Sequence, residues 1–263
     1  MLAQQRQAAV LDLVRVRGGV RVAELVRHFG VSDMTIRRDL EVLADRGLVD
    51  KVHGGAVVVG ARSADEPGFA AKSGRQTAEK EAIAARAAQL VEPGAAVALS
   101  AGTTTAALAA RLVDVPDITV VTNSIRVSDV LHRAGRVDQT VVLTGGIRTP
   151  SDALAGPVAE AAIASLNVDL LFLGVHGMSA DAGFTTPNLM EASTNRRLVD
   201  AARRLVVLAD HTKWETVGLA TIAPLDAADV LVTDSGLPAA ARDHLAARVG
   251  EMVVVDPARQ EAS

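Results

Sequence analysis

The chain has 263 residues, a net charge of −4 and no cysteine. Without cysteine, disulfides, thiolate nucleophiles and cysteine-ligated metal centres are excluded, and a cytoplasmic location is expected. Apolar runs are short, and no basic segment followed by an apolar stretch opens the chain, so we expect neither a membrane span nor a signal peptide. A composition of 49% hydrophobic but only 2% aromatic residues favours helices around a parallel sheet.

The charge is unevenly distributed along the chain. Residues 1–60 carry nine Lys and Arg against seven Asp and Glu, whereas residues 61–263 carry 18 against 24. This asymmetry predicts two parts that face different partners. An excess of two positive charges is a weak indication of nucleic-acid binding, so the placement of the basic residues has to decide the question.

Two amphipathic helices are predicted in the first thirty residues. Val10 and Val14 lie on one face of the helix predicted in RQAAVLDLVRVRG. Val22 and Leu25 lie on one face of the helix predicted in RVAELVRHFG. The second helix ends at Gly30, because glycine readily adopts the left-handed conformation that terminates helices.

A third helix is predicted in the segment SDMTIRRDLEVL, which follows almost at once. Ser32 is a suitable N-cap, and apolar residues recur from Ile36 at spacings of four and three. At about 100° per residue, Met34 and Arg38 point away from this apolar stripe and Arg37 lies on its flank. The tight turn between the second and third helices indicates a helix-turn-helix.

Two β-prone segments around a glycine pair, in LVDKV-HGG-AVVV, predict a hairpin and hence a winged helix-turn-helix. The N-terminal part of such a third helix enters the DNA major groove, where arginines contact guanine edges or phosphates. The predicted DNA-binding residues are Ser32, Met34, Thr35, Arg37, Arg38, Lys51 and His53. The alternative is an ordinary solvated face, with Asp39 and Glu41 beside the arginine pair.

The chain is predicted to contain a DNA-binding domain at 1–58, a linker at 59–76 and an α/β domain at 77–257. The linker is rich in Gly, Ser and charge and lacks periodicity. Beyond it, helices alternate with short apolar strands, which predicts a largely parallel sheet. The strands are expected near 96–100, 118–122, 140–143, 169–174, 205–209, 229–233 and 251–255.

The loops after these strands are small, hydroxylated or glycine-rich: SAGTTT, TNS, TGGIR, GVHGM and ADHTKW. Such loops converge on the ligand crevice of an open α/β sheet, and a helix opening at TTTAALAARL can bind an anion at its N-terminus. Arg148 and Lys213 can add positive charge, so the lining suits a phosphorylated polyol. The alternative is that these residues serve only the turn conformation. The sequence has neither of the usual nucleotide fingerprints, G-x-x-x-x-G-K-[ST] and G-x-G-x-x-G.

The segment VSDMTIRRDLEVLADRGLVDKVHGGAV resembles the N-terminal signature of the DeoR-type family of bacterial transcriptional regulators, with Lys51 where arginine is frequent. Several later segments are similar to the effector domain of that family, so the resemblance covers nearly the whole chain. These segments are SAGTTT, VTNS, LTGGIR, ALAGPVAE, LGVHGM, LMEAS and DHTKW. It implies an N-terminal winged helix-turn-helix joined to a larger α/β domain related in fold to sugar-phosphate isomerases.

The resemblance also implies a function. We expect a regulator rather than an enzyme, and specifically a repressor of a sugar or carbohydrate catabolic operon that binds operator DNA, responds to a phosphorylated sugar and needs no cofactor. One winged helix reads few bases, and the family oligomerises, so a homodimer or homotetramer is expected. The effector contacts implied by the resemblance are Gly102, Thr103, Thr104, Thr105, Asn123, Ser124, Gly145, Gly146, Arg148, Glu191 and Lys213.

The sequence departs from the family pattern at three places. Ser100 and Ala101 replace a frequent Asp-Ser, Asn195 replaces a frequent lysine, and His211 replaces a frequent serine. The first two departures change charge near the expected crevice, so the sequence leaves the identity of the sugar open.

Three other functions are alternatives to a repressor. The first is a sugar-phosphate isomerase-like enzyme, for which the acid and base candidates are Glu191, Asp181, Lys213, His176 and His211. Metal binding is disfavoured because the six histidines show no ligand spacing. An architectural DNA-binding protein, whose second domain only oligomerises, would differ in having a crevice that binds nothing.

Overall fold

The computed structural model describes residues 2–17, 19–46, 48–52, 54–58, 66 and 68–258. The chain divides into two compact units, Met1–Arg62 and Ser63–Ser263. Within the described ranges, no helix has the length and apolar character needed to cross a membrane.

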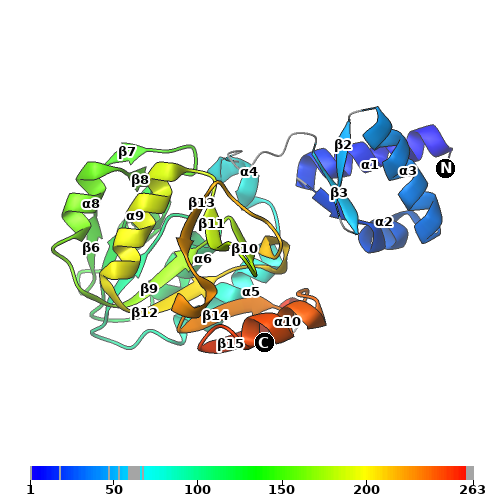
Figure 1. Ribbon diagram of the computed structural model, residues 1–263. Coiled ribbons are helices and arrows are strands. Elements are labelled where there is room, and N and C mark those ends of the chain that lie inside the picture. The colour runs from blue at the N-terminus through cyan, green and yellow to red at the C-terminus, as the bar shows by residue number, and fades with distance from the viewer. Residues whose placement is uncertain are drawn as a thin grey trace. The chain divides into compact units, whose positions relative to one another are not determined.

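The N-terminal unit is a winged helix-turn-helix, as predicted (Figure 1). Its elements in chain order are α1 (Ala3–Arg17), β1 (Gly19–Arg21), α2 (Val22–Phe29), α3 (Asp33–Asp45), β2 (Val49–Val52) and β3 (Gly55–Val58). The strands pair in the order β1-β3-β2, and all pairs are antiparallel. Strands β2 and β3 form the predicted hairpin, whereas β1 was not predicted because three residues are too few to show an alternating pattern.

The core of this unit is built from the predicted apolar stripes. Val10, Val14, Leu25, Ile36 and Leu40 are each at most 2% exposed and pack into one cluster. Burial of these side chains fixes which faces of α1, α2 and α3 remain on the surface.

The turn between α2 and α3 is closed by the two predicted caps. Gly30 has φ 63°, and its N–H donates to the carbonyl oxygen of Val26 at 2.9 Å. The Ser32 Oγ accepts from the N–H of Thr35 at 3.2 Å. The C-cap of α2 and the N-cap of α3 are thus confirmed, and they set the angle at which α3 leaves the turn.

The C-terminal unit is an α/β unit, as predicted. Its helical segments are α4 (Phe69–Ser73), α5 (Thr77–Ala88), α6 (Thr103–Leu112), α7 (Ile125–Ala134), α8 (Pro157–Ile163), α9 (Leu189–Asp200), η1 (His211–Lys213), η2 (Leu225–Ala227) and α10 (Ala239–Ala246). Its main strands are β4 (Ala96–Leu99), β5 (Thr119–Thr122), β6 (Thr140–Leu143), β9 (Val168–Gly174), β12 (Ala202–Leu208), β14 (Val230–Asp234) and β15 (Glu251–Val255).

These main strands form a seven-stranded sheet in the order β15-β14-β12-β9-β4-β5-β6, and every neighbouring pair in the described chain is parallel. Both faces are covered by helices (Figure 1). Alternate residues of β4 divide between two cores: Val97 and Leu99 join the core of α5, α6 and α7, whereas Ala98 joins the core of α8, α9 and α10. Burial on both faces explains why the strands are almost continuously apolar.

Some elements differ from the sequence prediction. Short strands β10 (Gly177–Ser179), β11 (Gly183–Thr186) and β13 (Ala220–Ala223) form an antiparallel sheet, and β7 (Ile147–Arg148) pairs with β8 (Leu154–Ala155). Of the predicted linker, residues 59–65 and 67 lie outside the described residues, but its later part forms α4, which packs against α6. A helix of five residues is too short to produce a periodic pattern, so the composition alone suggested a loop there.

Candidate DNA-binding helix and effector crevice

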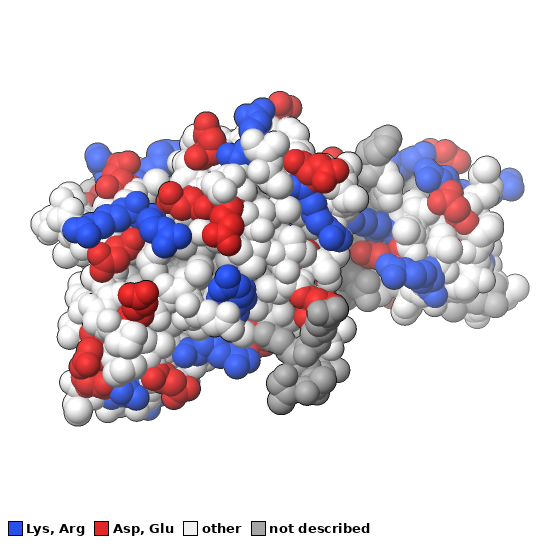
Figure 2. All heavy atoms as spheres, turned by 90° about the horizontal axis from the view of Figure 1, so that it is seen from below, with Lys and Arg blue, Asp and Glu red and all other residues white. Residues whose placement is uncertain are grey.

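Positive and negative side chains are mixed on the face of the protein that is turned to the viewer in Figure 2. The N-terminal residues 1–60 carry only two more basic than acidic side chains. Geometry rather than net charge therefore locates the candidate surfaces.

Three of the predicted DNA-binding residues share the exposed face of α3. Met34 is 74% exposed, and Arg37 and Arg38 are exposed beside it. Arg37 forms an ion pair with Asp33, one turn earlier. Arg38 forms no hydrogen bond or ion pair with another residue that the structure describes. Arg38 is therefore the more available of the two guanidinium groups.

The other predicted DNA contacts lie at the start of α3 and on the wing. Ser32 and Thr35 begin the helix, and their hydroxyl oxygens are 2.8 Å apart. Lys51 lies on β2 and donates to Glu41 of α3 at 2.9 Å, which joins the wing to the helix. His53 lies outside the described residues.

Asp39 does not belong to a solvated face, as one interpretation of the sequence held. Its side chain is buried and receives hydrogen bonds from two residues of α1: Arg6 Nη2 at 3.3 Å and Gln7 Nε2 at 3.1 Å. Since Arg6 also forms an ion pair with this carboxylate, α1 and α3 are held together at this point. The contact therefore anchors α3 to α1 at the residue that directly follows the exposed Arg38.

In the α/β unit, the first turn of α6 follows β4 at the carboxyl edge of the sheet. Gly102 precedes the helix, and no described side chain caps its N–H groups. Thr105 is buried, and its hydroxyl donates to the carbonyl oxygen of Gly102 at 3.1 Å. The hydroxyls of Thr103 and Thr104 have no such partner within the described ranges. The turn therefore offers backbone N–H groups, with their partial positive charge, and two hydroxyls.

The predicted residues after β5 are buried and already paired. Asn123 Oδ1 accepts from the N–H of Ala101 at 3.0 Å, and its Nδ2 donates to the carbonyl oxygen of Leu154 at 3.2 Å. The Ser124 Oγ caps α7 by accepting from the N–H of Val127 at 3.2 Å. These side chains fix the positions of three loops at this edge of the sheet, because their polar atoms hold the loops together.

The predicted residues after β6 form a glycine turn and an ion-pair network. Gly145 has φ 71° and Gly146 has φ 124°, which are left-handed conformations that favour glycine. The Arg148 Nε donates to Asp152 Oδ1 at 2.9 Å, and Arg126 donates to Asp152 Oδ2 at 2.6 Å. These bonds, Arg148 first, lower the pKa of Asp152. An effector would have to share Arg148 with this carboxylate.

Glu191 lies in the first turn of α9 and is only 8% exposed. The Thr149 hydroxyl donates to its Oε1. Burial, reinforced by the nearby carboxylate of Glu66, raises the pKa of Glu191 to about 7. Glu191 therefore changes protonation near neutral pH and can either donate or accept a hydrogen bond.

Lys213 ends the short helix η1 after β12, and its Nζ lies 3.9 Å from Asp210 Oδ2. That Oδ2 is buried and has no hydrogen-bond partner among the described residues. His211 bonds to Asp234 through Nδ1 at 2.7 Å, which raises the pKa of His211. Burial, together with the charge of Lys213, lowers the pKa of His176 to about 4 and keeps that ring neutral. Lys213 and Asp210 are thus the charged pair presented at this strand end.

Sequence analysis did not single out Asp210, Glu66, Lys72 or Ser151. Asp210 could have been identified as a candidate site residue from the sequence, because it directly follows a predicted strand and begins the DHTKW loop. Glu66 and Lys72 lie in the predicted linker, and no periodic pattern marks them.

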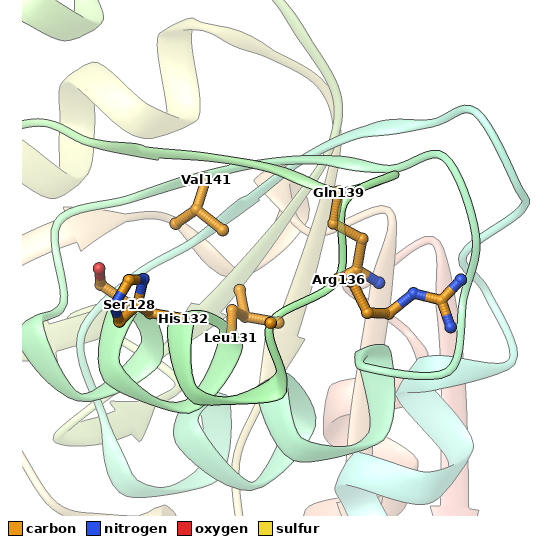
Figure 3. A pocket seen from close by; sticks show the side chains of 7 residues that line it. Ser128, Leu131, His132, Arg136, Gln139 and Val141 are labelled. Carbon is orange, nitrogen blue, oxygen red and sulfur yellow. The ribbon is translucent and has the colours of Figure 1, made fainter.

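A separate hollow of about 410 Å³ lies between α7 and β6. Figure 3 shows Leu131 and His132 of α7 facing Val141 of β6 across it. The residues predicted to contact an effector do not line this hollow in the described chain. Within the same ranges, no group of three or more His, Asp or Glu side chains is arranged to hold a metal ion.

A winged helix-turn-helix unit followed by an α/β unit with polar side chains at the carboxyl edge of its sheet defines a DNA-binding regulator that carries a sensor domain. Residues 6–62 match the DeoR-like helix-turn-helix domain, and residues 75–235 match the DeoR C terminal sensor domain. The chain therefore belongs to the DeoR family of transcriptional regulators.

Characterised relatives match over most of the chain. The HTH-type transcriptional regulator GlpR of Haloferax volcanii is 37% identical over 93% of this chain and 95% of its own length. The glycerol-3-phosphate regulon repressor of Escherichia coli K12 is 30% identical over 90% of this chain and 93% of its own length. Among solved structures, ribose 5-phosphate isomerase A of Methanocaldococcus jannaschii matches 52% of this chain and 54% of its own chain, with 16% identity and a TM-score of 0.39.

Proposed function

We propose that the protein represses a sugar or carbohydrate catabolic operon, and that a phosphorylated sugar bound in the α/β unit controls its affinity for operator DNA. The observation that carries the proposal is the uncapped first turn of α6, at the same edge of the sheet as Glu191 and Lys213. Free N–H groups bind a phosphate, and a carboxyl and an ammonium group bind sugar hydroxyls. The relative named as a glycerol-3-phosphate regulon repressor supports the same class of effector.

The DNA-binding surface in this proposal is the exposed face of α3 together with the wing. Arg38 contacts a base edge or a phosphate in the major groove, and Lys51 contacts the DNA backbone. One such unit reads few bases, so two or four copies act together on repeated half-sites in the cytoplasm. Because coupling is reciprocal, an effector that weakens DNA binding is itself bound more weakly by the DNA complex.

A sugar-phosphate isomerase-like activity is the second candidate function. The observation that favours it is Glu191, whose pKa of about 7 suits a general base or acid at neutral pH. Isomerisation of the same sugar phosphates by the purified protein would support this candidate.

The deciding experiment is a fluorescence-anisotropy titration of the full chain against DNA from its own upstream region, at fixed salt. The titration is repeated with a panel of sugar phosphates and with the matching unphosphorylated sugars as controls. We expect competitor-resistant binding that one phosphorylated sugar changes and its unphosphorylated form does not. Binding at the non-specific level only, with or without sugars, would contradict the proposal.

A further inference from the structure

Residues 66 and 68–76, here called the strap, precede α5 and contact the loop between β7 and β8. Glu66 Oε1 accepts from the N–H of Ser151 at 3.2 Å and from its hydroxyl at 2.8 Å. Glu66 Oε2 accepts from Asn188 Nδ2 at 2.7 Å. Three donors thus converge on one carboxylate.

The strap is also fastened along the rest of its length. The N–H of Phe69 donates to the carbonyl oxygen of Pro150 at 3.2 Å, and the Arg126 guanidinium lies 5.1 Å from the centre of the Phe69 ring. Lys80 is buried and donates from Nζ to the carbonyl oxygen of Lys72 at 2.7 Å. Helix α4, the helical part of the strap, packs against α6 (Figure 1). The strap therefore belongs to the wall of the candidate crevice.

The groups around the Glu66 carboxylate are those that bind anions. A backbone N–H, a hydroxyl and an amide NH₂ point at it, and Lys72 Nζ donates to the same Ser151 hydroxyl oxygen at 2.9 Å. Although burial acts in the opposite direction, the bonds from Asn188 and Ser151 lower the pKa of Glu66, so it is ionised at neutral pH.

The effect of the neighbouring Glu191 carboxyl depends on its protonation, because a hydrogen bond between Glu191 and Glu66 also helps to lower the pKa of Glu66. Glu191 is buried beside Glu66, and the Glu66 charge adds to the burial that raises the pKa of Glu191. Above the pKa of Glu191, two negative charges face each other. A ligand anion that displaced Glu66 would keep the donors satisfied and would free the strap.

We propose that Glu66 is an internal ligand that occupies an anion-binding site formed by Ser151, Asn188 and Lys72, and that an anionic group of the effector competes with it and releases the strap. The inference rests on the proposed function, because it assigns a second anion-binding position to the same crevice. Only residues 59–65 separate the strap from Val58, the last residue of the wing strand β3. The strap therefore lies close in the sequence to the DNA-binding unit.

The first test measures inorganic phosphate binding to the full chain by isothermal titration calorimetry, for wild type and for Glu66→Gln. Because the substitution removes the charge that competes for the donors, we expect phosphate to bind about tenfold more tightly. Glu81→Gln is the matched control. Glu81 of α5 is half-buried and pairs with Arg111 at 3.1 Å. Glu81→Gln changes the net charge by the same amount as Glu66→Gln.

The second test measures hydrogen exchange of residues 68–76. In the wild type, we expect saturating phosphate to increase exchange of the strap, whereas in Glu66→Gln exchange is already high without phosphate. Asn188→Asp provides an opposing variant, because it keeps the oxygen that caps α9 but turns the donor into an acceptor. It should release the strap and weaken phosphate binding together. A purely structural role of Glu66 would leave phosphate affinity unchanged in Glu66→Gln.

The outcomes separate this inference from the proposed function. Three results would refute the proposal that Glu66 is an internal ligand, whatever sugar phosphates do to operator binding. They are equal phosphate affinity in Glu66→Gln and wild type, no phosphate binding by Glu66→Gln, and an equal gain in affinity in Glu81→Gln. If Glu66→Gln gains affinity but no sugar phosphate changes operator binding by the wild type, the internal ligand stands and the proposed function fails.

Discussion

Replacement of Glu191 by glutamine should remove a pH-dependent loss of stability from the α/β unit. The pKa of Glu191 rises from 4.5 to about 7 on folding, which at about 1.36 kcal/mol per pKa unit corresponds to about 3 kcal/mol in favour of the protonated form. That stabilisation is complete below pH 4.5 and is lost as the pH rises through 7. Glutamine is neutral throughout, so between pH 5 and pH 8 the variant should gain about 2–3 kcal/mol relative to the wild type.

The assay is urea unfolding of both proteins at several pH values, followed by the fluorescence of Trp214. This is the only tryptophan of the sequence and lies in the α/β unit. His176 imposes an opposite trend, because its pKa is lowered to about 4, so stability is lost as the pH falls from 6.5 towards 4. The contribution of His176 is the same in both proteins, so it cancels in the difference between their free energies of unfolding. Parallel pH profiles for wild type and Glu191→Gln would refute the argument from burial.

Three further variants test the two candidate surfaces and the wing. Arg38→Ala should weaken operator binding by about 1–3 kcal/mol in anisotropy titrations. Unchanged affinity would mean that Arg38 is only a solvent-exposed side chain and does not contact DNA. Thr103→Val combined with Thr104→Val should abolish the effector response while operator binding persists; a retained response would exclude the first turn of α6. Gly55→Ala places a Cβ 2.2 Å from the carbonyl oxygen of Val20 and should destabilise the winged unit by about 1–3 kcal/mol in thermal unfolding followed by circular dichroism. A wild-type melting curve would mean that β1 can move aside.

The parts of the fold that the sequence predicts are those with strong local signals. Strand β9 is a run of buried apolar residues, and Ser32 precedes an apolar stripe of helical period, so both were identified correctly. Strand β1 depends on a partner far along the chain: Val20 pairs with Ala56. Its three residues contain no pattern that local reasoning can detect.

The candidate site shows the same division. Gly102 to Thr105 begin α6, as the glycine and hydroxyl residues between a strand and a helix predicted, and their contact with an effector stays a prediction. The pairing of Asp39 with Arg6 and the contact of Glu66 with Ser151 join residues far apart in sequence, so a single sequence does not reveal them. The family resemblance supplies roles for single residues, but not the network in which Arg148 is already bound.

The strand order of the large sheet also has a consequence for synthesis of the protein. The first strand of this sheet to leave the ribosome is β4, which lies inside the sheet. Strands β5 and β6 then add in turn to one side of β4. The later strands β9, β12, β14 and β15 then add one after another to its other side. Each emerging strand finds its neighbour already made, so the nascent chain never has to open a finished pair.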